Sequence, residues 1–108
     1  MVILAHGRES DPVFFYANRM ALTLFELTAS EAIRLPSRFS AEPMERAARA
    51  AFLQTVTERN FIADYSGIRI SRNGKRFRIG EAIVWNLIDT QGHLHGQAAC
   101  FDQWQPIE

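Results

Sequence analysis

The chain has 108 residues, of which 47% are hydrophobic, and its formal net charge at pH 7 is zero. This length fits one compact domain, residues 1–108, with a single core, and the apolar fraction is too high for a disordered chain. A balanced charge indicates neither a nucleic-acid partner nor an anionic membrane surface.

The single cysteine, Cys100, excludes an intramolecular disulfide and a cysteine-based zinc site. A chain without disulfides suits a reducing compartment. The opening "MVILAHGRESD" has only a short apolar stretch before its charged residues, which is too short for a signal peptide or a membrane span. We therefore expect a soluble, cytoplasmic protein.

The first third of the chain predicts short elements. Residues 13–17, "VFFYA", have the β-branched and aromatic composition of a strand. Asn18 is expected to end that strand by capping a helix through its side-chain oxygen. The apolar positions of this helix are Met20, Ala21, Leu24 and Phe25. "TASE" at 28–31 has the form of a capping box and predicts a second short helix over 29–35, which Pro36 ends. A further strand is expected at 2–5.

The longest helix is predicted over 43–59, with a proline in its first turn. Its apolar stripe is expected to consist of Met44, Ala47, Ala48, Ala51, Phe52 and Val56. Its solvated face is expected to consist of Glu45, Arg46, Arg49 and Glu58.

The remainder predicts a three-stranded antiparallel meander. The first strand, "FIADYSGIRIS", is followed by Asn73-Gly74, which is a strong hairpin signal. "RFRIGEAIVWNLID" predicts a long strand with a bulge near Gly80, and "TQG" predicts another turn. The last strand is "HLHGQAACFDQW".

This order of elements resembles the PAS domain, in which helices cover one face of a five-stranded antiparallel sheet. More narrowly, "ESDPVFFYANRMALTLFE", "LPSRFSAEPM", "YSGIRISRNGKRFRI", "VWNLID" and "GQAACFDQW" resemble the MEKHLA family. That family is a PAS-like module found alone in bacteria and at the carboxyl end of plant homeodomain-leucine zipper proteins. The resemblance runs from about Leu4 to Trp104 and implies an α+β fold with the short helices and the long helix on one sheet face.

The resemblance also bears on cofactors. Blue-light flavin domains of this class place a reactive cysteine in an "N-C-R-F" stretch, and here Ser37 precedes Arg38-Phe39. Haem-binding relatives commonly use a histidine on or near the long helix, and residues 43–59 contain none. Neither covalent flavin photochemistry nor haem is expected, so the purified protein is expected to be colourless.

A metal site is not expected either. His93 and His95 form an H-x-H pair on one strand face, but His6 is far away in sequence and no carboxylate cluster accompanies the pair. Two solvated histidines beside a turn explain this pattern better than metal ligation.

A PAS-like fold implies a pocket between the sheet and its helices, where an unidentified small organic ligand could bind. The residues expected to line it are Phe25, Phe39, Phe52, Tyr65, Arg69, Asn86, Ala98 and Cys100. Tyr65 and Arg69 share a strand face, and a buried arginine there needs a counter-charge such as a ligand carboxylate. Alternatively, Arg69 pairs with a protein carboxylate or points outward.

The other pocket assignments also have alternatives. Asn86 is equally a strand-end hydrogen bonder. Ala98 and Cys100 either leave room for a ligand or let a helix pack closely. Cys100 is expected to be an inert buried thiol, since no histidine pattern activates it.

A sheet with helices on one face leaves its other face open, and both faces of the long strand are apolar. The outer face is expected to carry either Ile83, Trp85 and Leu87 or Val84 and Ile88, extended by Phe101. Such a patch favours a symmetric homodimer with Trp85 as its anchor. The alternative is that Trp85 points into the core.

Three functions fit these observations. The first is a non-enzymatic sensory module that binds a small organic molecule and acts through a regulatory protein partner. The second is an interaction module whose cavity is filled by its own side chains, namely Phe25, Phe39, Phe52 and Trp85. The third is a small cone-shaped α+β enzyme with Asp64 or His95 as base, which no sequence motif supports.

Overall fold

The structure is a computed structural model that describes residues 1–107. Within this range no helix is both long enough and apolar enough to cross a membrane. The helices and strands, in chain order, are β1 (Val2–His6), β2 (Phe14–Ala17), α1 (Arg19–Phe25), α2 (Ala29–Ala32), the 3-10 helix η1 (Ser37–Ser40), α3 (Pro43–Arg59), β3 (Phe61–Ile70), β4 (Arg76–Ile88), β5 (Leu94–Phe101) and β6 (Gln103–Ile107).

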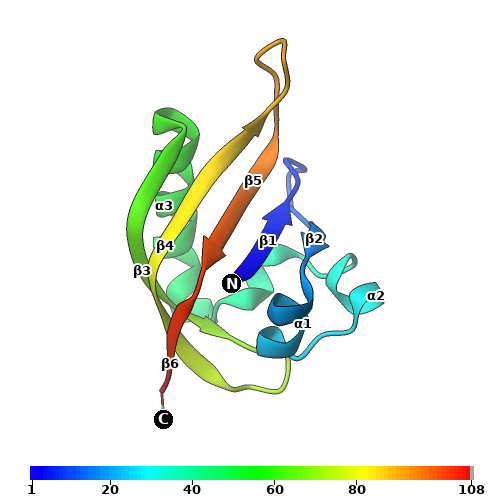
Figure 1. Cartoon of the computed structure of the whole chain (residues 1–108), viewed down its shortest axis with the longest axis vertical. Helices are drawn as coiled ribbons and strands as arrows, with labels where there is room; N and C mark the ends of the chain where they lie inside the picture. The colour runs from blue at the N-terminus through cyan, green and yellow to red at the C-terminus, as the bar shows by residue number, and fades with distance from the viewer. Residues whose placement is uncertain (108) are drawn as a thin grey trace.

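The strands form one antiparallel sheet in the order β2-β1-β5-β4-β3, and β6 pairs with the first half of β4. Figure 1 shows α3 lying behind β3 and β4, with the short helices beside β1 and β2. The predicted α+β class, the antiparallel pairing and the extra strand near the N-terminus are confirmed. The sheet has six strands rather than five, because the expected last strand is interrupted at Asp102 and continues as β6.

Side-chain caps explain why the chain leaves the sheet after β2. The Asn18 Oδ1 atom accepts a hydrogen bond from the backbone N–H of Ala21 and caps α1. Thr28 and Glu31 make a reciprocal capping box at the start of α2. Both caps were predicted from the sequence, although α2 ends at Ala32, earlier than expected.

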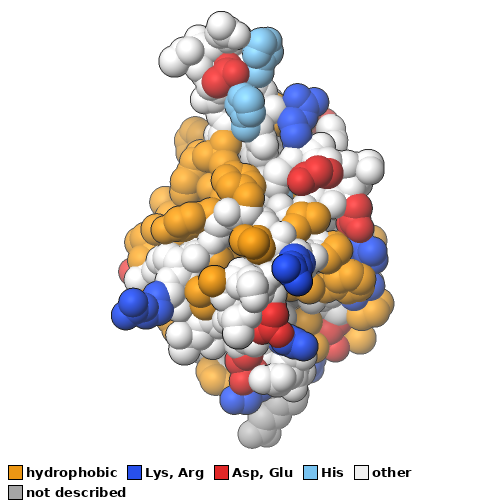
Figure 2. Space-filling view, turned by 90° about the vertical axis from the view of Figure 1, so that its right-hand side faces the viewer, with side chains coloured by type: hydrophobic (Ala, Val, Ile, Leu, Met, Phe, Trp, Pro, Cys, Tyr) orange, Lys and Arg blue, Asp and Glu red, His pale blue; other side chains and the backbone are white. Residues whose placement is uncertain are grey.

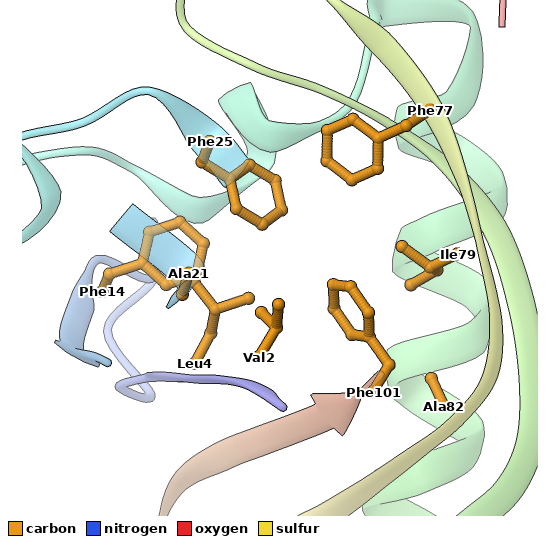
Figure 3. Close-up of a cluster of buried hydrophobic side chains, with 9 residues drawn as sticks. All are labelled: Val2, Leu4, Phe14, Ala21, Phe25, Phe77, Ile79, Ala82 and Phe101. Atoms are coloured by element: carbon orange, nitrogen blue, oxygen red, sulfur yellow. The ribbon is translucent and has the colours of Figure 1, made fainter. Parts of the chain in front are cut away.

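The core lies between the sheet and the helices. Phe25 packs edge-on against Phe77 with a centroid separation of 5.2 Å, and Figure 3 shows side chains from β1, β2, α1, β4 and β5 converging on one interior. The buried cluster consists of Val2, Leu4, Phe14, Ala21, Phe25, Phe77, Ile79, Ala82 and Phe101.

Helix α3 has the predicted limits, but its predicted faces are partly wrong. Met44 is 74% exposed, and Ala47, Ala48 and Ala51 are exposed as well. Phe52 and Val56 do face inward, and Arg49 turns inward with them. Methyl groups of alanine contribute little apolar area, so the larger Phe52 and Val56 set the rotation of the helix.

The register of the sheet assigns each residue to a face. Val84 pairs with Ala99, and Ala99 pairs with Leu4, so these three side chains lie on the inner face. Trp85 pairs with Ala98 and therefore lies on the opposite, outer face. Phe101, expected on the outer face, is instead 2% exposed in the core.

Gly96 marks a close approach of two strands. Its φ is +156°, and a Cβ atom there would overlap the carbonyl oxygen of His6 on β1. We expect Gly96→Ala to lower the free energy of unfolding by about 1–3 kcal/mol, because both strain and the clash oppose a side chain. Gly80→Ala is the control, since a Cβ at Gly80 meets nothing within 4 Å. Equal denaturation midpoints for the two variants would contradict this assignment.

Candidate functional site

A cavity of about 60 Å³ lies between α3 and the inner face of the sheet. This volume gives room for roughly four to six water molecules. Most of its wall is apolar, which suits the burial of an organic ligand. The lining residues are Leu4, Ala5, His6, Phe14, Phe25, Ser40, Arg49, Phe52, Leu53, Tyr65, Arg69, Ile79, Val84, Gln97, Ala98, Ala99 and Phe101.

Strand β3 contributes Tyr65 and Arg69 to the wall. The Arg69 Nη2 atom donates a hydrogen bond to Tyr65 Oη at 3.0 Å, and Nη1 donates to the carbonyl oxygen of Ile68 at 2.7 Å. The ring of Phe52 on α3 stacks on Tyr65 with a centroid distance of 3.7 Å. The helix, the tyrosine and the arginine therefore form one packed unit that fixes the position of the guanidinium.

Helix α3 adds a second guanidinium. Arg49 lines the cavity, and its pKa is lowered to about 10, first by burial and then by the nearby positive charge of Arg69. Arg49 was expected on the solvated face of this helix; instead its side chain is partly buried and lines both the cavity and the groove beside α3. The inward turn of Phe52 and Val56 brings Arg49 with them, because positions three and seven residues apart share a helix face.

No carboxylate neutralises this pair within residues 1–107. The ion pairs that the described chain contains join other residues, such as Arg76 with Glu42 and Arg38 with Asp11. Arg69 therefore does not pair with a carboxylate among the described residues. It does not point outward either, since it is only 8% exposed. Its hydrogen-bond partners are uncharged, so the positive charge remains.

Besides the two arginines, the histidine His6 of β1 also lines the cavity. It is 8% exposed, and Nδ1 lies 2.9 Å from the carbonyl oxygen of Gly7. Burial lowers the pKa of His6, the hydrogen bond to Gly7 raises it, and Arg49 lowers it further. The imidazole is therefore held neutral at pH 7, with Nδ1 donating to the carbonyl.

A groove runs beside α3 next to the cavity. His6, Arg49, Leu53 and Gln97 line both spaces, so they form the wall that the groove and the cavity share. The outer wall of the groove is the segment between β1 and β2, residues 7–12. Arg49 therefore lies between the groove and the cavity, whereas Arg69 lines the cavity alone.

Five of the residues predicted to contact a ligand line the cavity. They are Phe25, Phe52, Tyr65, Arg69 and Ala98. Ala98 pairs with the outward-facing Trp85, so it contributes backbone rather than its methyl group. Its neighbour Ala99 is the small residue on the inner face.

Three of the predicted contacts lie elsewhere. Phe39 is 41% exposed and stacks beneath the guanidinium groups of Arg38 and Arg46. Cys100 pairs with Ile83 and so belongs to the outer face. It is also only partly buried, contrary to expectation.

Asn86 is the third, and it acts as the strand-end hydrogen bonder that was its alternative. Its Nδ2 atom donates to the carbonyl oxygen of Thr57 and to Asn60 Oδ1, both at 3.2 Å. Its Oδ1 atom accepts from Gln97 Nε2 at 3.1 Å. The side chain joins the end of α3 to the sheet instead of lining the cavity.

Sequence analysis missed His6, Ser40, Arg49, Leu53 and Gln97 as cavity residues. The spacing of Arg49 from Phe52 and Val56 on α3 was a usable signal, because those three positions form one face. The position of Gln97 could not be predicted in this way, since the pairing of β5 with its neighbouring strands decides which of its faces points inward.

The residues considered for metal binding or catalysis lie apart from the cavity. His93 and His95 both contact the Asp89 carboxylate on the β4–β5 hairpin, at 3.4 and 2.9 Å. Asp64 is exposed on β3. Among residues 1–107 no group of three or more histidine, cysteine or acidic side chains has the arrangement of a metal site.

The outer face of the sheet carries the predicted apolar surface. Ile83, Trp85 and Leu87 alternate along β4 and share this face, and Ile83 is 44% exposed. Phe61 on β3 pairs with Trp85 and is 60% exposed, and Tyr16 on β2 is 49% exposed. Of the two alternatives for this face, the structure has Ile83, Trp85 and Leu87 outward and Val84 inward.

The model of the MEKHLA domain family matches residues 1–106, and the chain belongs to this family. It is also similar to the homeobox-leucine zipper protein HOX9 of rice, Oryza sativa subspecies indica and japonica. The identity is 26% over 107 residues, which cover 94% of this chain and 12% of HOX9. The chain thus spans only a small part of the curated relatives that it matches.

Solved structures with a similar fold are PAS and light-oxygen-voltage (LOV) domains. The LOV domain of the blue-light photoreceptor Aureochrome1 has a TM-score of 0.76 at 17% identity, covering 94% of this chain and 74% of that one. A PAS domain from Colwellia psychrerythraea gives 0.74 at 13% identity, over 91% and 80%. The light-state dimer of the fungal photoreceptor Vivid gives 0.70 at 14% identity, over 91% and 74%. These likenesses establish a PAS-like fold.

A flavin, the cofactor of blue-light domains of this fold, does not fit the cavity in this shape. Its three fused rings need more room than the roughly four to six water molecules that the cavity holds. Ser37 stands where a reactive cysteine is expected, and its Oγ atom is buried without a hydrogen-bond partner in the described chain.

The neutral state of His6 predicts a pH dependence of stability. The folded pKa lies below the ordinary 6.5, so below about pH 6.5 the unfolded chain binds a proton that the folded chain does not. Stability is therefore complete above this pH and falls as the pH drops towards the folded pKa, by at most about 1.4 kcal/mol per unit.

Chemical denaturation of wild type and His6→Gln from about pH 7.5 to 5 measures this slope. We expect a smaller fall for His6→Gln and a wild-type fall for His93→Gln, which removes an exposed histidine. Parallel curves for wild type and His6→Gln would show that His6 does not carry the effect.

Proposed function

We propose that this domain is a non-enzymatic sensory module that binds a small organic anion in its cavity and acts through protein–protein contacts. What supports the proposal is the buried guanidinium of Arg69, which has no carboxylate partner in the described chain, inside a largely apolar cavity. A charge in such a site costs free energy unless a counter-ion neutralises it. A ligand carboxylate would form the charge-assisted hydrogen bonds that the protein itself does not supply.

The choice of a sensory rather than a catalytic role rests on the make-up of the cavity. Its lining contains no carboxylate, cysteine or serine–histidine–aspartate set that would act as base and nucleophile. The residues considered as catalytic bases, Asp64 and His95, do not line it. The PAS-like fold and the MEKHLA family agree with a sensory role.

The alternative, a module that fills its cavity with its own side chains, is weaker on two grounds. Phe25 and Phe52 already line the cavity and still leave space between them. Phe39 and Trp85, the other residues proposed to fill it, lie outside the lining.

Removal of Arg69 tests ligand binding. A thermal-shift screen of small organic carboxylates would first provide a binder, whose affinity calorimetry then measures for Arg69→Ala. We expect a loss of roughly 1.5–3 kcal/mol, the contribution of a hydrogen bond to a charged group. Arg78→Ala is the matched control, because Arg78 lies on the neighbouring strand, is exposed and does not line the cavity. Unchanged affinity for Arg69→Ala would remove this residue from the site.

We also propose that the outer sheet face pairs with a second copy of the chain. The apolar outer face consists of Ile3, Ala5, Tyr16, Phe61, Ile83, Trp85, Leu87, Ala98 and Cys100. In Figure 2, where the face that looks at the reader in Figure 1 is turned to the left, hydrophobic side chains gather along that edge. No charged side chain interrupts this set, and a two-fold axis would place each copy of the patch on the other.

Trp85 is the expected anchor of the dimer, because large aromatic side chains dominate interface energetics. Ala98 opposite it leaves space for the indole ring. Sedimentation velocity should show a wild-type dimer and a folded Trp85→Ala monomer. Met44→Ala, which removes an apolar side chain that is 74% exposed on α3, should remain dimeric. A wild type that sediments as a monomer at high micromolar concentration would rule out the dimer, and unfolding of Trp85→Ala would indicate a core role instead.

A further inference from the structure

The cavity contains more positive charge than one carboxylate can neutralise. Arg49 from α3 and Arg69 from β3 both line it, and each guanidinium carries a full charge at neutral pH. They are close enough for Arg69 to lower the pKa of Arg49. Two like charges in one small, largely apolar space repel each other, and burial strengthens the repulsion.

The described chain offers no internal counter-charge for either group. In residues 1–107 no carboxylate oxygen lies within 4.0 Å of a nitrogen of Arg49 or Arg69. Glu9 lies across the groove, where it raises the pKa of His6. His6 is itself neutral, so it adds an acceptor or a donor but no negative charge. The remaining polar lining groups, Tyr65, Ser40 and Gln97, are uncharged side chains.

A monocarboxylate would neutralise one guanidinium and leave the other, whether the buried Arg69 or the partly buried Arg49, without a counter-charge, which is costly. We propose that the natural ligand is a small organic dianion, whose charged end bridges Arg49 and Arg69 and whose remainder is apolar. This inference rests on the proposed ligand-binding function and specifies the ligand class. Short dicarboxylates and phosphate monoesters share this chemistry, since both present two negative charges and several acceptor oxygens.

The apolar part of the ligand follows from the apolar part of the wall. Phe14, Phe25 and Ile79 also line the cavity and belong to the hydrophobic cluster. A fully polar dianion would leave these side chains facing its charge without hydrogen bonds. An aromatic or short aliphatic group attached to the anionic end would cover them instead.

Two probes of nearly equal shape separate charge from size. Benzenesulfonate and phenylphosphonate both join a phenyl ring to a tetrahedral anionic head, but at about pH 8.5 the first carries one negative charge and the second carries close to two. At this pH Arg49 is charged, because its pKa is about 10, and the lowered pKa of His6 keeps the imidazole neutral. Calorimetry should show at least about tenfold tighter binding of phenylphosphonate to the wild type. A second dianion, phthalate, tests whether a dicarboxylate head replaces the phosphonate.

The variant Arg49→Met tests whether Arg49 is the residue that binds the second negative charge of the ligand. We expect it to reduce the preference for phenylphosphonate to less than about threefold. We also expect the ligand-free variant to have a higher melting temperature than the wild type, because a partly buried charge that faces Arg69 is replaced by an apolar side chain of similar length. Arg59→Met is the control on the same helix, since Arg59 is exposed in the last turn. It should keep the wild-type preference and show no rise in melting temperature.

The outcomes distinguish the two proposals. Equal affinity for both sulfonate and phosphonate, or a preference that survives Arg49→Met, overturns the dianion while ligand binding stands. A lower melting temperature of ligand-free Arg49→Met overturns the claim that its charge is unpaired. Failure of all three probes to bind overturns the dianion and the proposed binding function together.

Discussion

The feature on which the site depends is a pair of guanidinium groups held inside a PAS-like fold without a protein carboxylate. Arg69 is fixed by hydrogen bonds to Tyr65 and to its own neighbour's carbonyl, and Arg49 faces it from α3. These partners orient the charge but do not neutralise it. A fold that keeps such a charge gives up stability that the proposed anion would restore on binding, and this exchange would couple the proposed binding to the packing of α3.

The position of α3 is tied to the sheet at both the cavity and the helix end. Phe52 stacks on Tyr65 at the cavity, while Gln97 Nε2 donates to the carbonyl oxygen of Leu53 at 3.2 Å and Asn86 bonds to the end of the helix. On β4, Val84 lines the cavity and the next residue, Trp85, faces outward. The proposed ligand site and the proposed dimer face are therefore separated by a single layer of sheet. A conformational change at the cavity would need to cross only this layer to reach the dimer face.

The sequence was informative about local structure and family. Capping residues, the hairpin dipeptide and the limits of α3 were predictable because each depends on a few adjacent residues. Tyr65 and Arg69 were also assigned to one strand face, and both line the cavity. In contrast, the rotation of α3 was misjudged, because four small or flexible side chains outnumbered the two large ones that decide its packing.

The errors in the site have the same origin. Arg49 was placed in solvent on the rule that charged residues are exposed, a rule that fails here because the helix face that carries Phe52 and Val56 also carries Arg49. Phe101 and Cys100 alternate along β5, and only the pairing with β4 and β1 decides which of them faces inward. Such assignments depend on contacts between distant segments, which composition and periodicity do not contain.

The most direct test of the unpaired-charge account is native mass spectrometry of the freshly purified chain. The account predicts a species heavier than the 12.3 kDa chain by the mass of a small acidic compound, bound without a covalent bond and absent from a variant that lacks both Arg49 and Arg69. Only the bare chain, both as purified and after incubation with phenylphosphonate, would contradict it.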